Sequence, residues 1–205
     1  MDPVDLALVL AIDVSASVDY DEFALMLGGL SAAFLDRDVI AAATGGRRGA
    51  VAVAALFWSE VPEVALPWER LADAADGARI AEALITAPRL PRAGATALGD
   101  GLVAALTLLG RCPATATRLA IDVSGDGAAN RGRASGPVRD VAVASGVVIN
   151  GLAVVNEEPD LLAYYAAEVI GGPGSFAMDC ADYADFAEAI GRKLVREFRG
   201  PSLDV

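Results

Sequence analysis

The chain has 205 residues, 55% of them hydrophobic and 21% charged, which is typical of one well-buried globular core and excludes a disordered or coiled-coil chain. Its formal net charge is −12, so nucleic acids and anionic membranes, which need a basic face, are unfavourable partners. The sequence contains no histidine, which excludes Ser-His-Asp triads, Cys-His dyads and zinc sites that use histidine.

The first predicted element is a strand over residues 6–12, a run of Leu, Val, Ala and Ile that ends abruptly in polar residues. Such a run is typical of a strand buried on both faces of a parallel sheet. The loop after it contains Asp13, Ser15 and Ser17. In open α/β sheets, ligands bind at this carboxyl end of the strands. One carboxylate and two hydroxyls there offer the hard oxygen ligands that small divalent cations prefer.

The next elements predict a hairpin at one edge of the sheet. Apolar residues at helical spacing, with acidic residues in the first turn, predict a helix over 19–36. A strand over 50–58 and a second strand over 61–66 follow, and the link between them is too short for a crossover. We therefore expect an antiparallel pair at the edge of an otherwise parallel sheet.

Helices and strands continue to alternate after this hairpin. The remaining predicted elements are helices over 72–87, 98–110, 137–145, 159–170 and 183–198 and strands over 118–123, 147–155 and 175–178. Asn150 and Gly151 fall inside a strand, where the flanking pattern favours a polar position or a bulge over a hairpin turn. The predicted fold is α/β: a three-layer, doubly wound and mostly parallel six-stranded sheet with helices on both faces. We expect one domain over 1–205, with its core at about 4–199 and a frayed tail over 200–205.

Two later stretches carry candidate partners for the first polar loop. Thr96 lies in a glycine-rich loop just before a predicted helix, and Asp126 follows a predicted buried strand between Gly125 and Gly127. Each piece alone has an ordinary explanation, because threonine also caps helices and a Gly-Asp-Gly stretch also forms turns. Three pieces in this order on an alternating background indicate one metal site, because independent features then agree.

Taken together, Asp13, Ser15, Ser17, Thr96 and Asp126 resemble the metal-ion-dependent adhesion site (MIDAS) of von Willebrand factor type A (vWA) domains. That site combines an Asp-x-Ser-x-Ser loop, a distant Thr and an Asp-Gly after a strand. The resemblance covers essentially the whole chain and implies the strand order 3-2-1-4-5-6. Three local strings resemble a bacterial subfamily of such domains whose function is uncharacterised: residues 121–127, 149–152 and 169–174.

The resemblance implies a role for each residue of the site. Ser15, Ser17 and Thr96 are expected to contact the metal directly, and Asp13 and Asp126 to act directly or through water. Such a set supplies little formal charge, so the cation stays electrophilic and can accept an Asp or Glu carboxylate from a partner protein. Mg²⁺ is the expected cation and Mn²⁺ is a substitute, whereas Ca²⁺ prefers more oxygen ligands than this set provides. The expected function is therefore divalent-metal-dependent protein binding.

Other polar residues near the site have two interpretations each. Candidate rim residues lie in the surrounding loops: Asp19, Tyr20, Asn130, Arg131, Asn156 and Glu157. Each of them is also explained as a solvated loop residue. Asp122 interrupts an apolar strand and either orients a metal ligand or is a buried polar residue satisfied by the backbone. Asp100 is expected to complement the dipole of its helix.

Enzymes form the competing class. A Rossmann dehydrogenase needs glycines after the first strand, where residues 13–17 have none, and the P-loop sequence is absent. A metal-dependent phosphotransferase or hydrolase with Asp13 as nucleophile is the better alternative. However, Ser15 stands where a second carboxylate is usual, and the only lysine, Lys193, lies in the last predicted helix. A structural vWA domain that uses no metal is the third alternative.

The cysteines and the N-terminal residues bear on the cellular compartment. Cys112 precedes a predicted strand and Cys180 follows one, so we expect two free thiols about 20 Å apart, too far for a disulfide. The run 6–12 lacks a basic start and is followed by Asp13 instead of a small-residue cleavage site, so it does not predict a signal peptide. We expect a soluble chain, secreted or periplasmic if a leader has been removed and cytoplasmic otherwise.

Overall fold

The computed structural model describes residues 1–200; the part of the predicted tail at 201–205 lies outside the described residues. One sheet contains six strands: β1 (Val4–Asp13), β2 (Val51–Trp58), β3 (Glu63–Leu71), β4 (Ala116–Gly125), β5 (Val147–Val154) and β6 (Ala177–Cys180). The strand order is β3-β2-β1-β4-β5-β6. β2 and β3 pair antiparallel, and all other neighbours pair parallel. The predicted fold class, strand order and edge hairpin are confirmed.

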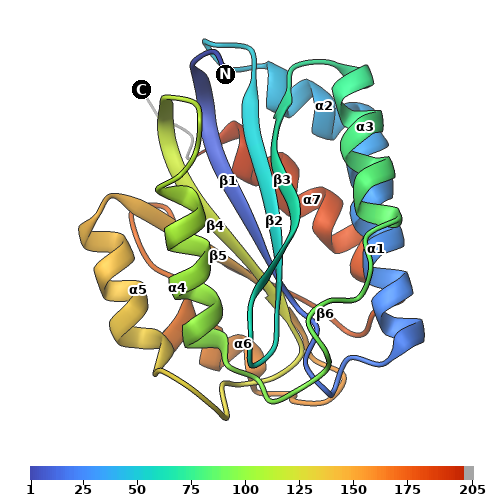
Figure 1. The fold of residues 1–205 in the computed structure, drawn as a ribbon, viewed down its shortest axis with the longest axis vertical. Helices are drawn as coiled ribbons and strands as arrows, with labels where there is room; N and C mark the ends of the chain where they lie inside the picture. The colour runs from blue at the N-terminus through green and yellow to red at the C-terminus, as the bar shows by residue number, and fades with distance from the viewer. Residues whose placement is uncertain (201–205) are drawn as a thin grey trace.

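Helices cover both faces of the sheet (Figure 1). They are α1 (Tyr20–Leu35), α2 (Arg37–Thr44), α3 (Ala74–Ile85), α4 (Leu98–Leu109), α5 (Ser135–Ala144), α6 (Leu161–Tyr164), the π-helical turn η1 (Tyr165–Val169) and α7 (Phe186–Arg199). α1, α2, α3 and α7 lie on one face, and α4, α5 and α6 on the other. Leu8 and Leu10 of β1 point into the first layer while Val9 and Ala11 point into the second, which explains why the strand is apolar throughout.

The chain between residues 19 and 44 forms two helices where the sequence predicts one. Asp36 has an extended backbone, which ends α1. Its side chain then accepts hydrogen bonds from the backbone N–H groups of Asp38 and Val39, which caps the start of α2. The cap lets the chain change direction and pack a second short helix on the same face of the sheet.

Two predictions near β5 need correction. β6 begins two residues later than predicted, at Ala177, because the Asn150 side chain accepts the backbone N–H of Phe176 at 2.9 Å and replaces a ladder bond there. Asn150 is therefore the polar position that the sequence favours, and the β4–β5 register runs through it without a bulge. The predicted helix over 159–170 divides into α6 and η1.

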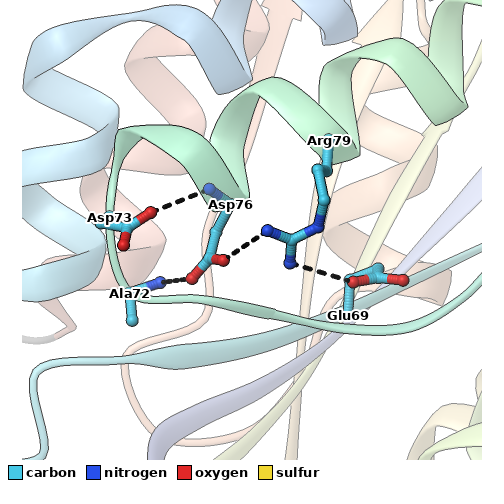
Figure 2. Close-up of polar contacts among 5 residues, drawn as sticks. All are labelled: Glu69, Ala72, Asp73, Asp76 and Arg79. Atoms are coloured by element: carbon cyan, nitrogen blue, oxygen red, sulfur yellow. Dashed lines mark hydrogen bonds and ion pairs between the residues drawn. The ribbon is translucent and has the colours of Figure 1, made fainter.

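The start of α3 is held by a compact set of polar contacts, drawn in Figure 2. Asp73 caps the helix by accepting the backbone N–H of Asp76 at 2.9 Å. The Asp76 carboxylate accepts the backbone N–H of Ala72 at 2.9 Å and pairs with Arg79 at 2.7 Å. Arg79 also lies 3.6 Å from Glu69 on β3. These contacts begin α3 at Ala74, two residues after the predicted start, and join the helix to the edge strand.

Both cysteines are free, as predicted. Burial raises the pKa of the Cys180 thiol to about 12, so this thiol stays protonated and unreactive at neutral pH. Within residues 1–200, no helix has the length and apolar character needed to cross a bilayer.

Candidate metal centre

The candidate site lies at the carboxyl ends of β1 and β4, at the lower edge of the sheet in Figure 1. Four segments that are distant in sequence meet there through backbone hydrogen bonds. The N–H of Ala16 donates to the carbonyl of Gly94 at 2.8 Å, and the N–H of Val14 donates to the carbonyl of Trp58 at 2.9 Å. The N–H of Asn130 donates to the carbonyl of Thr96 at 3.0 Å. Parallel strands bring their following loops to one edge, so these contacts follow from the topology.

The structure brings the five predicted ligand residues together. Ser17 Oγ donates to Asp126 Oδ1 at 2.7 Å, and Ser15 Oγ lies 3.3 Å from Ser17 Oγ. Thr96 Oγ1 lies 3.5 Å from Ser15 Oγ although the two residues are 81 positions apart. Asp13 Oδ1 accepts the backbone N–H of Ser15 at 2.7 Å, which shapes the loop. The result is a connected cluster of two carboxylates and three hydroxyls.

The cluster has a buried floor and one open side. Asp13, Ser15 and Asp126 are fully buried and Thr96 is 6% exposed, whereas Ser17 faces solvent. Burial, together with the negative charge of Asp126, raises the pKa of Asp13 to about 7. Burial also raises the pKa of Asp126. Two neighbouring buried carboxyl groups of this kind are stabilised in their ionised form by a cation.

The donor set fits a hard divalent cation. All five side chains present oxygen atoms, and Oδ2 of Asp13 and Oδ2 of Asp126 are buried without a hydrogen-bond partner. Each ionised carboxylate accepts at about four lone-pair positions, so both groups retain capacity for a cation or its water ligands. Within residues 1–200, no three His, Cys, Asp or Glu side chains are grouped to hold a metal by themselves. A site here would therefore depend on the hydroxyls.

Asn130, predicted only as a rim residue, holds Thr96 in place. Its Oδ1 accepts the backbone N–H of Thr96 at 3.0 Å, and its amide lies 3.5 Å from Thr96 Oγ1. The N-cap position of α4 is Ala97 and has no side-chain cap, so the alternative that Thr96 caps the helix is wrong. Thr96 thus keeps its hydroxyl for the cluster.

Arg89 is a residue of the site that the sequence did not indicate. It lies in the loop between α3 and α4, and its guanidinium donates to the carbonyls of Ser15 and Val18. The same group lies 4.9 Å from the ring centroid of Tyr20 and 5.5 Å from that of Phe23. Arg89 therefore braces the loop that carries the serine hydroxyls. Arg89 lies in a loop that has neither helical nor strand periodicity, so no pattern in the sequence predicts this contact.

The other rim residues have mixed surroundings. Asp19 caps α1 in a capping box with Glu22, and Asn156 donates to Glu22 at 3.1 Å. Arg131 lies 3.8 Å from Glu60, and the Tyr20 side chain is 79% exposed. Their part in binding stays a prediction. Asp100, in the first turn of α4, also pairs with Arg133.

The interpretation of Asp122 as a buried polar residue is confirmed, but its partner is a lysine side chain and not the backbone. Its Oδ1 lies 2.5 Å from Nζ of Lys193, and Lys193 also pairs with Glu197 at 2.8 Å. This ion cluster is buried between β4 and α7, so Asp122 pairs with a side chain of the last helix instead of relying on the backbone. A role for Asp122 in orienting a metal ligand stays a prediction. Lys193, which the sequence placed in the last helix, is fully buried there.

Comparison with solved structures defines the class of fold. The chain is similar to a von Willebrand factor type A protein from Catenulispora acidiphila, with a TM-score of 0.65 and 19% identity over 96% of this chain and 43% of that chain. It is similar to proximal thread matrix protein 1 (PTMP1) from the mussel byssus with a zinc-occupied MIDAS motif, with a TM-score of 0.64 and 19% identity over 94% of this chain and 45% of that chain. It is also similar to the pilus adhesin SpaC from Lactobacillus rhamnosus GG in its open conformation, with a TM-score of 0.65 and 15% identity over 97% of this chain and 30% of that chain. The fold is that of a vWA domain.

The sequence identifies the particular family. The chain belongs to the family described as protein of unknown function (DUF1194), whose profile matches residues 3–202. No curated protein matches the sequence. The chain spans less than half the length of the similar solved proteins, and the likeness at these identities concerns the fold alone.

Proposed function

We propose that this edge of the sheet is a protein-binding site that uses a divalent cation to capture a carboxylate of a partner. Ser15, Ser17 and Thr96 would hold the cation directly, and Asp13 and Asp126 would hold it directly or through water. The observation that carries the proposal is the meeting of three hydroxyls from two separate loops on two buried carboxyl groups. The apolar core on both faces of the sheet stabilises the fold. Folding alone therefore does not explain why these polar side chains cluster.

Mg²⁺ is the first candidate for the cation, with Mn²⁺ as a substitute and Ca²⁺ as a weaker candidate. All the donors are hard oxygen atoms, and the set is small enough to leave positions for water, as Mg²⁺ prefers. When bound, the cation would supply an electrophilic centre for a partner's Asp or Glu. The similar PTMP1 structure has zinc in its MIDAS motif, which supports metal use by a site of this type.

Two observations favour binding over the phosphotransferase alternative. The Asp13 carboxylate is fully buried and its Oδ1 is held by the Ser15 N–H, so it is poorly placed to attack a substrate. Lys193, the only lysine, is engaged with Asp122 and Glu197 inside the core and is not available to hold a phosphate. A pilus adhesin among the similar structures also supports an interaction module.

The first experiment is a calorimetric titration of chelator-treated protein with Mg²⁺ and Mn²⁺. We expect saturable binding to the parent protein and its loss in Asp13→Ala and Asp126→Ala, provided that both variants remain folded by circular dichroism. Asp38→Ala is the matched control, since Asp38 is an exposed aspartate in the first turn of α2 and away from the cluster.

Equal binding by the parent and both site variants would refute the site. If the parent itself binds neither metal, even with free acetate present to complete the coordination, the structural alternative that uses no metal becomes the better explanation.

A further inference from the structure

A cavity of about 590 Å³ lies at the end of the sheet away from the candidate metal centre, the upper end in Figure 1. It is enclosed by the amino-terminal halves of β4 and β5, the last turn of α7 and the loop before β6. Its volume falls in the range of about 300–1,000 Å³ that is usual for small-molecule sites. The residues that line it therefore decide which class of ligand it fits.

One wall of the cavity is apolar. Leu6 of β1, Ala120 of β4 and Val148 of β5 line it from the sheet. Val148 is only half-buried, whereas its neighbours Val147 and Ile149, which point to the opposite face, are buried. The α7 face of β5 is thus covered less completely than the opposite face at this point, and an apolar group of a ligand would cover it.

Two arginines line the cavity as well. The Arg196 guanidinium lies over the ring of Phe176, 3.7 Å from its centroid, and within residues 1–200 it has no ion-pair partner. Arg118 donates to the backbone carbonyls of Glu197 at 3.0 Å and Phe198 at 2.8 Å. A guanidinium has five N–H groups, so both arginines keep donors that a ligand could use.

Asn150 adds a neutral donor to the cavity. The residue is 5% exposed, and its Oδ1 accepts the backbone N–H of Phe176 at 2.9 Å, which fixes the orientation of the amide. In the described part of the chain, 1–200, the amide nitrogen of Asn150 has no hydrogen-bond partner. A buried amide group without a partner is uncommon in folded proteins, and an acceptor inside the cavity would provide one.

The charges that a ligand in the cavity can reach are positive. The charged residues in its lining are Arg118, Arg196 and Glu197. The side chains of Glu197 and of the neighbouring Asp122 are at most 1% exposed, and both carboxylates are paired with Lys193. The two arginines therefore dominate the accessible surface, although the chain as a whole has a formal net charge of −12. Such a cavity favours an anion over a cation.

We propose that the cavity binds a small carboxylic acid with an apolar body, such as a medium-chain fatty acid. The carboxylate accepts from Arg196 and from the amide of Asn150, which both contact Phe176, and Arg118 adds a second positive charge. The planar guanidinium matches the geometry of a carboxylate. The apolar chain lies along the wall formed by β1, β4 and β5. This site is separate from the candidate metal centre and does not depend on its function.

The test is a calorimetric titration of the full chain with octanoate, in chelator and below the concentration at which octanoate forms micelles. We expect saturable binding to one site in the parent protein. Arg196→Gln should weaken it by about 10-fold, the loss expected for one charge-assisted hydrogen bond. Arg199→Gln is the matched control, because Arg199 is an exposed arginine in the same turn of α7 and does not line the cavity. Circular dichroism checks that both variants are folded.

A second measurement varies the ligand and leaves the parent protein unchanged, so it does not depend on the folding of a variant. Hexanoate should bind about 10-fold more weakly than octanoate, the effect of two fewer buried methylene groups. Octylammonium has the same apolar chain with the opposite charge, and it should bind at least about 10-fold more weakly than octanoate. The first comparison tests the apolar wall and the second tests the recognition of the carboxylate.

Each contrary result overturns a defined part of the proposal. A parent protein that does not bind octanoate overturns the site itself. Equal losses in Arg196→Gln and Arg199→Gln, or octylammonium that binds as tightly as octanoate, overturn the recognition of a carboxylate in the cavity. Equal affinities for hexanoate and octanoate overturn the placement of the chain on the apolar wall.

Discussion

The carboxyl group of Asp13 is the most perturbed acid of the candidate site. Burial and the charge of Asp126 raise its pKa from 3.8 to about 7. Between these two values the folded, metal-free protein keeps a proton on Asp13 while the unfolded chain has released it. The stability that depends on protonated Asp13 is therefore fully present below the unfolded pKa and is lost as pH rises through the folded pKa. A bound cation requires Asp13 in its ionised form. The stabilisation of the fold by the cation should therefore increase as the pH rises over the same range.

We therefore predict opposite pH trends for the metal-free and metal-bound protein. Raising the pH from about 5 to about 8 should lower the melting temperature in chelator and enlarge the increase in melting temperature that Mn²⁺ produces. Thermal unfolding with and without Mn²⁺ measures both trends. Burial raises the pKa of Asp126 as well, so Asp13→Asn is needed to isolate the part due to Asp13. A Mn²⁺ effect that is the same at both pH values would contradict the prediction.

At the scale of elements, the contact between α1 and α7 depends on one of two adjacent glycines. A Cβ on Gly29 would lie 2.9 Å from the Cα of Ala187, so the two helices approach too closely there for a side chain. A Cβ on Gly28 would meet no atom within 4 Å. Packing does not require glycine at position 28, where glycine only makes α1 more flexible. At position 29, in contrast, the absence of a side chain permits the close approach of α7.

The two positions should respond to alanine with opposite signs. Gly28→Ala should raise the free energy of unfolding by up to about 1 kcal/mol, because alanine is the better helix former. Gly29→Ala should lower it by about 1–3 kcal/mol, because the added methyl overpacks the interface. Urea denaturation of the two variants is the measurement, and each serves as the control for the other. Shifts of the same sign and size would show that the helix interface does not distinguish them.

At the scale of the whole molecule, a buried ion cluster joins the sheet to the last helix. Lys193 of α7 lies 2.5 Å from Asp122 of β4 and 2.8 Å from Glu197, and all three side chains are at most 1% exposed. The Lys193 ammonium also lies 5.5 Å from the ring centroid of Phe176. Burial acts to lower the pKa of Lys193, but Asp122 and Glu197 outweigh it and the pKa is raised. The lysine is therefore charged inside the core.

Breaking this cluster should destabilise the whole fold. Lys193→Met leaves two buried acids without a cation and should reduce the free energy of unfolding by about 3–5 kcal/mol. Adding Asp122→Leu to Lys193→Met should recover part of the loss, since one buried charge is then removed. The control is Arg192→Met, at the preceding position, where the side chain is 63% exposed and pairs with Glu188 at 3.5 Å. Similar losses in Lys193→Met and Arg192→Met, measured by chemical denaturation, would contradict a role for the cluster.

The sequence by itself determined the class of fold and the identity of the five clustered residues. The apolar run before Asp13 and the one that ends near Asp126 are local patterns, and buried parallel strands require such runs. The link between β2 and β3 is too short for a crossover, so the hairpin was also a local property. Because parallel strands end at one edge, the loops that carry the polar residues had to meet there.

Only the tertiary structure decided which other groups surround these residues. Arg89 and Asn130 reach the site from segments that show no shared pattern in the sequence. The pairing of Asp122 with Lys193 likewise depends on how α7 packs across β4. Periodicity reports whether a residue is buried and on which side of its own element it lies. It does not report which distant side chain occupies the space opposite, because that is set by the packing of the layers.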